Sequence, residues 1–285
     1  MKVLEVNRAM LGKQNQCRQL IELLPDIKGV GFDALYLLPV LEKGELNAVG
    51  SPYCIRDFWK LDPDFGTDED WYDLQKSCAQ HQLEIWIDWV MNHSAWDHSW
   101  MTTNPEWYIW DEDNQARVHP PGTDWTDVVQ LSFHHDCVAH FADLALDWIL
   151  KRGVKGFRCD ASYRIPPRVW YYFFQLLGMQ KRNARWLADN RFSEMNELGF
   201  DGCFSDGPLH FSLSVWNKIY DHDRSAFGIL WNKEDDIRFY QMKRDIEGEL
   251  NWLIGMGMMF PHQQISFFEN QDFDPEKWTN WLKQL

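Results

Sequence analysis

Apolar residues along the chain fall into two alternating patterns. Short continuous apolar runs, typical of buried strands, alternate with longer stretches in which apolar residues recur at helical spacing. The strand-like runs lie at 3–6, 34–38, 84–90, 153–159, 185–188, 199–204 and 265–268. The helical stretches lie at about 14–27, from 67 or 68 onward, and at 140–150, 170–177, 235–254 and 275–285. Repeated strand–helix units predict a parallel sheet with helical crossovers.

The number of strands decides between an open, doubly wound sheet and a barrel. Seven strand-like runs come close to the eight of a (β/α)8 barrel, so we predict a barrel domain formed by residues 1–92 and 137–285. Residues 93–136 lack strong periodicity and predict a short inserted domain over the face where barrel sites form. After the seventh run only one helix fits. We therefore expect no eighth strand, and an open edge where the barrel would close.

Composition narrows the class of protein. The chain has 285 residues, 45% hydrophobic and 25% charged, which suits a packed core. Its net charge of −15 argues against nucleic acid or an anionic membrane as partner. The first residues do not resemble a signal peptide, and six scattered cysteines predict reduced thiols, so we expect a cytoplasmic protein. The 17 tryptophans suit both core filling and stacking on neutral ligands such as sugars.

Carboxylates recur where the predicted strands end. Asp88, Asp160, Asp189 and Asp272 each close or follow one of these strands, and barrel geometry would bring them to one face. Aspartate is also common after strands as a turn residue, which is the alternative for each one alone. Arg158 lies on the same strand face as Asp160 and would keep that carboxyl ionised, as a nucleophile requires, although a structural ion pair is the alternative. One ionised and one protonated carboxyl are what glycoside cleavage needs.

The motifs around these residues resemble those of the α-amylase family of glycoside hydrolases. GFDALYLLPV, GSPYCIRDF, DWVMNH, GFRCD and FFENQD resemble its conserved segments, in order and with barrel spacing. The stretch from NPEWYIW to DVVQL resembles the short domain B of its bacterial maltodextrin-acting members. The resemblance covers nearly the whole chain and implies a (β/α)8 barrel. It also implies that the family's C-terminal β-sandwich is missing here.

The resemblance also implies a role for each matching residue. Asp160 would be the nucleophile, and Asp272 would bind sugar hydroxyls and stabilise the transition state. Arg158 would orient Asp160. His93 would hydrogen-bond the sugar, and Tyr53 would stack under its ring. Four tryptophans would fall in or beside the sugar-binding face: Trp89, Trp96, Trp107 and Trp125.

Neighbouring positions have lesser implied roles. Asp88 and Asp57 would be structural supports. Asn92 matches a position that ligates calcium in some family members, but the other ligands are not visible, so we expect no metal and no organic cofactor.

Two site positions depart from the family pattern. Asp189 stands where the family has the glutamate that acts as general acid, and it is shorter by about 1.5 Å. Either the backbone compensates, another acid such as Glu194 serves, or activity is weak or absent. Gln271 stands where the family has a histidine; it can still donate a hydrogen bond to the substrate but cannot carry charge.

The prediction for function is therefore a retaining glycosidase acting on α-1,4-glucans, either hydrolysing them or transferring sugar. The alternative is an impaired or non-catalytic member that binds α-glucan or assembles with a partner. A partner chain or a missing C-terminal segment would complete the barrel. A third and weaker alternative is a barrel enzyme that uses the carboxylates to bind a metal.

Overall fold

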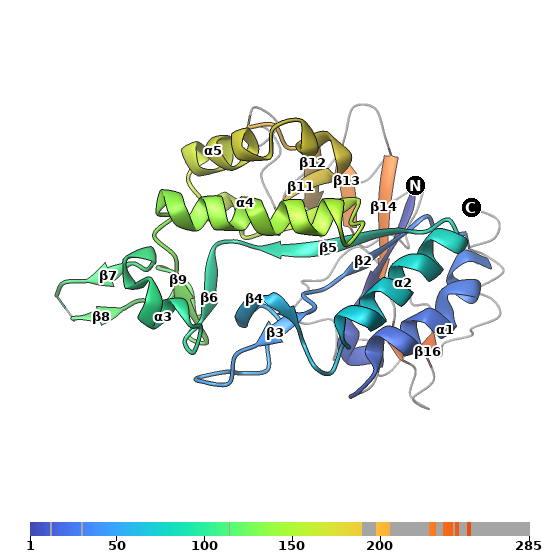
Figure 1. The fold of residues 1–285 in the computed structure, drawn as a ribbon, viewed down its shortest axis with the longest axis horizontal. Helices are drawn as coiled ribbons and strands as arrows, with labels where there is room; N and C mark the ends of the chain where they lie inside the picture. Colours follow the sequence, from blue (N-terminus) through green and yellow to red (C-terminus); the bar gives the residue numbers. More distant parts are fainter. Residues whose placement is uncertain are drawn as a thin grey trace, which may run out of the picture.

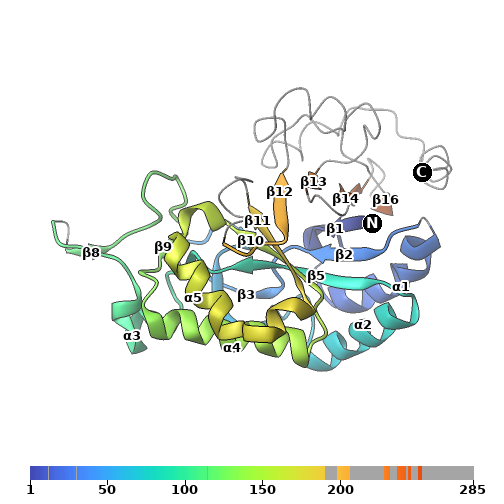
Figure 2. The same cartoon turned by 90° about the horizontal axis from the view of Figure 1, so that it is seen from above.

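The fold is a closed eight-stranded sheet with helices packed on part of its outer face (Figures 1 and 2). The computed structural model describes residues 1–11, 13–29, 31–113, 115–189, 198–205, 228–231, 236–241, 243–244 and 250–251. Around the barrel the strands follow the order β1 (Lys2–Val6), β14 (Asp236–Gln241), β13 (Gly228–Trp231), β12 (Gly202–Ser205), β11 (Arg185–Asp189), β10 (Gly156–Asp160), β5 (Glu84–Val90) and β2 (Ala34–Leu37).

Among the described residues, four long helices pack against the outside of this sheet. They are α1 (Gln16–Gly29), α2 (Asp68–Gln80), α4 (His135–Leu150) and α5 (Pro167–Leu177). Helices α1 and α2 pack together on one flank, and α4 and α5 pack together on the other (Figure 1). Helix α2 begins where the sequence predicts, because Thr67 and Asp70 form a reciprocal capping box. The predicted barrel and its first four helices are confirmed.

The closure of the barrel differs from the prediction. Strands β1, β2, β5, β10, β11 and β12 run parallel to one another, but β13 is antiparallel to both of its neighbours, β12 and β14. Strand β14 then pairs in parallel with β1, so the expected open edge is absent from the described part of the sheet. The predicted helix at 235–254 is wrong where β14 lies. The predicted strand at 265–268 and helix at 275–285 fall outside the described residues.

Small elements lie above the end of the barrel at which the parallel strands finish. Between β5 and α4 the chain forms β6 (His93–Ala95), α3 (Trp100–Thr103), β7 (Trp110–Asp111), β8 (Ala116–Arg117) and β9 (Val128–Gln130). The β7–β8 hairpin projects away from the barrel in Figure 1. A second hairpin, β3 (Leu41–Lys43) with β4 (Ile55–Leu61), follows β2. The remaining described elements are short: the 3-10 turns Arg8–Leu11, Pro105–Trp107, Ser162–Arg164 and Gly178–Asn183, and the strands β15 (Lys243–Arg244) and β16 (Leu250–Asn251).

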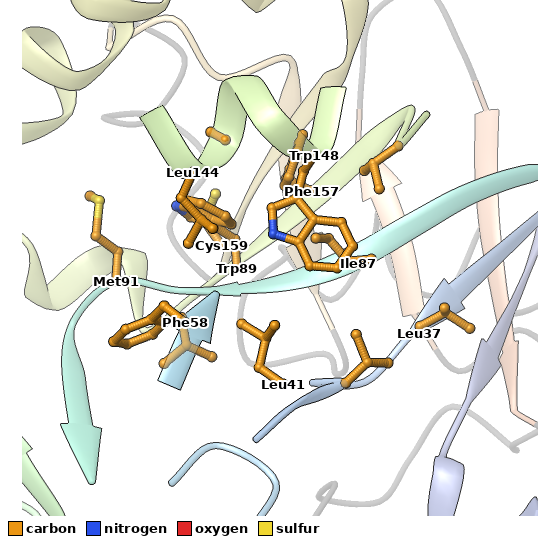
Figure 3. Close-up of a cluster of buried hydrophobic side chains, with 14 of the residues drawn as sticks. Leu37, Leu41, Phe58, Ile87, Trp89, Met91, Leu144, Trp148, Phe157 and Cys159 are labelled. Carbon is orange, nitrogen blue, oxygen red and sulfur yellow. The ribbon is translucent and has the colours of Figure 1, made fainter. Parts of the chain in front are cut away.

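Aromatic side chains fill the space between the sheet and its helices. Figure 3 shows Trp148 and Leu144 of α4 packed toward Phe157 and Ile87 of the sheet. Inside the barrel the ring of Trp86 fills the centre with Val3, Ala34, Tyr36 and Leu187. The five cysteines with described side chains are buried, and no disulfide joins them. Within the described residues, no helix combines the length and apolar character needed to cross a membrane.

Candidate active site

One guanidinium lies at the centre of the site. Arg158 of β10 donates from Nη1 to Asp160 Oδ1 at 2.7 Å and to Asp88 Oδ1 at 3.2 Å. Its Nη2 lies 3.1 Å from Asp189 Oδ1. The three carboxylates come from β5, β10 and β11, which are neighbours in the sheet, so parallel register brings their ends together. Three of the four predicted aspartates therefore meet around Arg158.

Two site residues cannot be placed in the same way. Asp272 and Gln271 lie outside the described residues. Their expected roles, in stabilising the transition state and contacting the substrate, stay predictions.

Asp88 is the buried carboxylate that anchors this group of residues. Its carboxylate accepts hydrogen bonds from the hydroxyls of Tyr36, at 2.5 Å, and Tyr53, at 3.0 Å, in addition to that from Arg158. Burial raises the pKa of Asp88 to about 6, with a further contribution from the negative charge of Asp160, while Arg158 and the two tyrosines act the other way. Asp88 thereby fixes the positions of Arg158 and Tyr53, in agreement with its expected supporting role.

Asp189 is held by a tight turn that follows Asp160. Ala161 adopts a left-handed backbone conformation with φ of 47°, and its N–H donates to Asp189 Oδ2 at 3.1 Å. The hydroxyl of Ser162 accepts from the Asp189 N–H at 2.7 Å and donates to its C=O at 3.0 Å. One carboxylate oxygen of Asp189 thus accepts a hydrogen bond from the Ala161 N–H, and the other is ion-paired with Arg158. The alternative candidate, Glu194, lies outside the described residues.

His93 contributes a neutral, buried imidazole. It begins β6 and pairs with Gln130 of β9. Burial lowers the pKa of His93 to about 4, so the ring is uncharged at neutral pH. Its Nδ1 lies 3.2 Å from the Asn92 amide nitrogen, and its buried Nε2 has no hydrogen-bond partner among the described residues. This nitrogen therefore has hydrogen-bonding capacity that the described residues do not use.

Asn92 is buried and hydrogen-bonds to another buried side chain. Gln130 Nε2 donates to the Asn92 C=O at 2.8 Å and to its Oδ1 at 3.3 Å. Sequence reasoning missed Gln130; its only signal was the resemblance of its segment to domain B. The amide oxygen that a calcium ion would need already accepts a hydrogen bond. Around Arg158 the central cation also opposes metal binding by the three carboxylates.

A separate group of possible metal ligands lies at the start of α4. The donor atoms of His134, His135 and Asp136 lie within 4.8 Å of one another, and the last two side chains are exposed. None of the three contacts Arg158 or its carboxylates through a described hydrogen bond or ion pair. Beside the β3–β4 hairpin there is also a hollow of about 330 Å³, lined mostly by charged residues and extending to Gly50 and Ser51. The three carboxylates do not line it.

Tryptophans were expected beside the sugar-binding face, and the outcome is mixed. Trp89 and Trp107 are buried in the core, so for these two the prediction is wrong. Trp96 is partly buried and anchors a loop by donating to the Thr126 C=O at 2.9 Å. Trp125 is the one that reaches the site, because its ring centroid lies 5.8 Å from that of His93.

Comparison with known proteins identifies the family. A family model described as the catalytic domain of alpha amylase matches residues 16–256. This chain belongs to the α-amylase family. The matched residues include the motif segments up to GFRCD, the barrel strands from β2 to β14 and the Arg158 cluster, which therefore belong to an α-amylase-type catalytic domain.

Individual relatives of this α-amylase-family chain carry several names. An alpha-1,4-glucan:maltose-1-phosphate maltosyltransferase of Cereibacter sphaeroides is 28% identical over 63% of this chain and 30% of its own length. Alpha-amylase 3 of Dictyoglomus thermophilum is 23% identical over 81% of this chain and 49% of its own. The chain thus spans from under a third to about half the length of these relatives.

Solved structures agree on the fold. A noncanonic maltogenic alpha-amylase AmyB from Thermotoga neapolitana superposes with a TM-score of 0.65 and 26% identity, over 71% of this chain and 48% of its own. An alpha-amylase from Lactobacillus plantarum gives a TM-score of 0.62 and 28% identity, over 78% and 55%.

Proposed function

We propose that this chain carries the active site of a retaining enzyme acting on α-1,4-glucans, which hydrolyses them or transfers sugar between them. The observation that carries the proposal is the contact between Arg158 and Asp160, with Asp189 bound to the same guanidinium. A guanidinium at 2.7 Å favours the ionised carboxylate that a nucleophile needs. The names of the maltosyltransferase and amylase relatives support α-glucan as substrate.

In this proposal each residue has one task. Asp160 attacks the anomeric carbon, and the bond to the leaving oxygen breaks as that oxygen receives a proton. Asp189 donates the proton and then removes one from water or from an acceptor hydroxyl, whose oxygen bonds to the anomeric carbon as the bond to Asp160 breaks, so that configuration is retained. His93 donates or accepts a hydrogen bond at a sugar hydroxyl, Tyr53 lies under the ring, and Asp272 stabilises the transition state.

The direct test is covalent trapping of the intermediate. Incubation with a fluorinated α-glucosyl fluoride, followed by peptide mass spectrometry, is expected to find the sugar on Asp160. Asp160→Asn serves as the control and is expected to carry no adduct. Absence of an adduct, together with no product from maltoheptaose at high protein concentration, would contradict an enzymatic role.

A second candidate function is α-glucan binding without turnover. It is favoured by Asp189, whose side chain is one carbon shorter than the family's glutamate and whose two oxygens are both engaged by the protein, one by the Ala161 N–H and the other by the ion pair with Arg158. A misplacement of about 1 Å can cost about a hundredfold in rate.

The variant Asp189→Glu separates the two functions. If the short side chain limits the reaction, Asp189→Glu is expected to raise maltoheptaose cleavage by about a hundredfold. Chromatography of the products measures the change, and Asp189→Asn, which cannot donate a proton, is the matched control. Equal rates for wild type and Asp189→Glu would contradict the idea that position 189 is the defect.

A further inference from the structure

We propose that Trp125 is a second sugar-binding aromatic residue, contributed by the inserted segment between β5 and α4. It would add to the α-glucan contacts of Tyr53 and His93 and set affinity rather than the chemical step. The inference deepens the proposed function and rests on it.

Position is the first argument. Trp125 lies 5.8 Å from His93 between ring centroids, at an interplanar angle of 63°. Its ring also packs against the buried group formed by Cys54, Ala95 and Val128. Cys54 directly follows Tyr53, so Trp125 lies on the wall of the site that already carries the two residues expected to contact sugar.

Rigidity is the second argument. The Arg164 guanidinium lies 5.3 Å from the centroid of the Trp125 ring, and Arg164 Nη2 donates to the Pro121 C=O. Arg164 ends the turn that begins after Asp160, so the tryptophan is tied to the same segment as the nucleophile. Trp96 fixes the next residue of the loop by donating to the Thr126 C=O. The Cys54 thiol donates to the Asp127 C=O at 3.0 Å.

Chemistry is the third argument. Trp125 remains partly exposed although it is held on several sides. An indole ring that is fixed before the ligand arrives offers apolar area for the C–H face of a sugar at little entropic cost. A flexible surface tryptophan would lose part of this gain in ordering its side chain. Neutral α-glucan oligosaccharides have the apolar C–H faces and hydroxyl edges that suit Trp125 and His93 together.

The test measures binding of maltoheptaose by isothermal titration calorimetry, with every protein, the wild type at position 125 included, carrying Asp160→Asn so that no turnover occurs. Trp125→Ala is expected to raise the Kd about tenfold, and Trp125→Phe about threefold, because part of the stacking area is kept. The matched control is Trp110→Ala. Trp110 is 42% exposed and also lies under an arginine, with Arg117 at 4.8 Å, but it sits on the β7–β8 hairpin. Its Kd is expected to stay at the wild-type value.

The outcomes are distinguishable. Equal affinity of wild type and Trp125→Ala overturns the inference and leaves the proposed function standing, and so does equal weakening by Trp110→Ala. No binding of maltoheptaose by wild type at millimolar concentration overturns the proposed function itself, and the inference with it. If near-UV circular dichroism shows that Trp125→Ala is unfolded, Trp125→Phe decides, and unchanged affinity there overturns the inference.

Discussion

Arg158 supplies one positive charge beside three carboxylates, and little of its side chain is exposed to water. Its side chain is 12% exposed, and that of Asp88 is fully buried. The variant Arg158→Met keeps most of the volume and removes the charge. We expect it to lower the free energy of unfolding by about 3–5 kcal/mol, because buried carboxylates lose their counter-charge. Urea unfolding followed by circular dichroism measures the change.

The control for this variant is Arg18→Met. Arg18 bonds to Asp70 at 2.8 Å, but its side chain is 71% exposed, so water replaces the partner and a far smaller loss is expected. Losses of similar size in the two variants would show that Arg158 does not carry the charge balance of the site.

For single residues, the sequence predicts a contact within one strand better than hydrogen bonds between strands. Arg158 and Asp160 are two residues apart on one strand, so their contact follows from strand periodicity. The hydrogen bond from Tyr36 to Asp88 and those between Ser162 and Asp189 were not predicted. These hydrogen bonds depend on the strand register and on the left-handed backbone of Ala161. A single sequence has no pattern that predicts either feature.

Strand β10 can approach the barrel centre because it begins with glycine. A Cβ atom on Gly156 would lie 2.3 Å from Cδ2 of the Trp86 ring, which is fully buried. Gly156→Ala is therefore expected to destabilise the fold by about 1–3 kcal/mol through overpacking. The urea midpoint measures this loss.

The end of α1 provides the comparison. A Cβ on Gly29 would meet nothing within 4 Å, so Gly29→Ala is expected to leave the midpoint within about 0.5 kcal/mol of wild type. Trp86→Leu makes room for the new methyl group. In that background Gly156→Ala is therefore expected to lower the free energy of unfolding by less than it does in wild type. If Gly156→Ala proves as harmless as Gly29→Ala, close packing of β10 on Trp86 is not what requires glycine.

Among the elements, buried strands with long apolar runs were predictable and β14 was not. Residues 84–90 are apolar almost throughout and became β5 as expected. The sequence DIRFYQ of β14 has Ile and Phe two apart, which suits a strand, within a longer stretch whose apolar residues also suit a helix. Pairing with β1, Phe239 opposite Val3, decides for the strand, and that contact joins the two ends of the barrel sequence.

Across the whole molecule, neutral histidines make stability depend on pH. Burial lowers the pKa values of His93 and His98 to about 4, against an ordinary value near 6.5. The unfolded chain then binds more protons than the folded one between pH 6.5 and 4, so the free energy of unfolding falls as pH drops through this window. The raised pKa of Asp88 acts in the opposite direction.

His98→Asn isolates one of these contributions. Asparagine can keep the acceptor for the Trp100 N–H, 3.0 Å from His98 Nδ1, but it does not titrate. The variant is expected to make the fall in unfolding free energy below pH 6.5 shallower, by up to about 1.4 kcal/mol per pH unit. Urea unfolding at half-unit steps measures the slope. Parallel curves for variant and wild type would contradict the assignment.

The sequence predicted the overall architecture because repeated strand–helix units leave few topologies. It did not predict the closure, in which the β13–β14 hairpin fills the last positions of the described sheet. The prediction of seven strands assumed that every strand was parallel and followed a helical crossover. An antiparallel hairpin uses less chain than a crossover and closes the ring without another helix.

The shared guanidinium also constrains how this site can evolve. A substitution of Arg158 is pleiotropic, because it disturbs Asp88, Asp160 and Asp189 at once. A substitution at position 189 that shortens the side chain can leave the ion pair in place, as the contact between Asp189 and Arg158 shows. A substitution at position 158 would remove all three ion pairs and destabilise the fold as well. An α-amylase-family member that loses activity by such a change at position 189 would still contain the ion pairs around its central arginine.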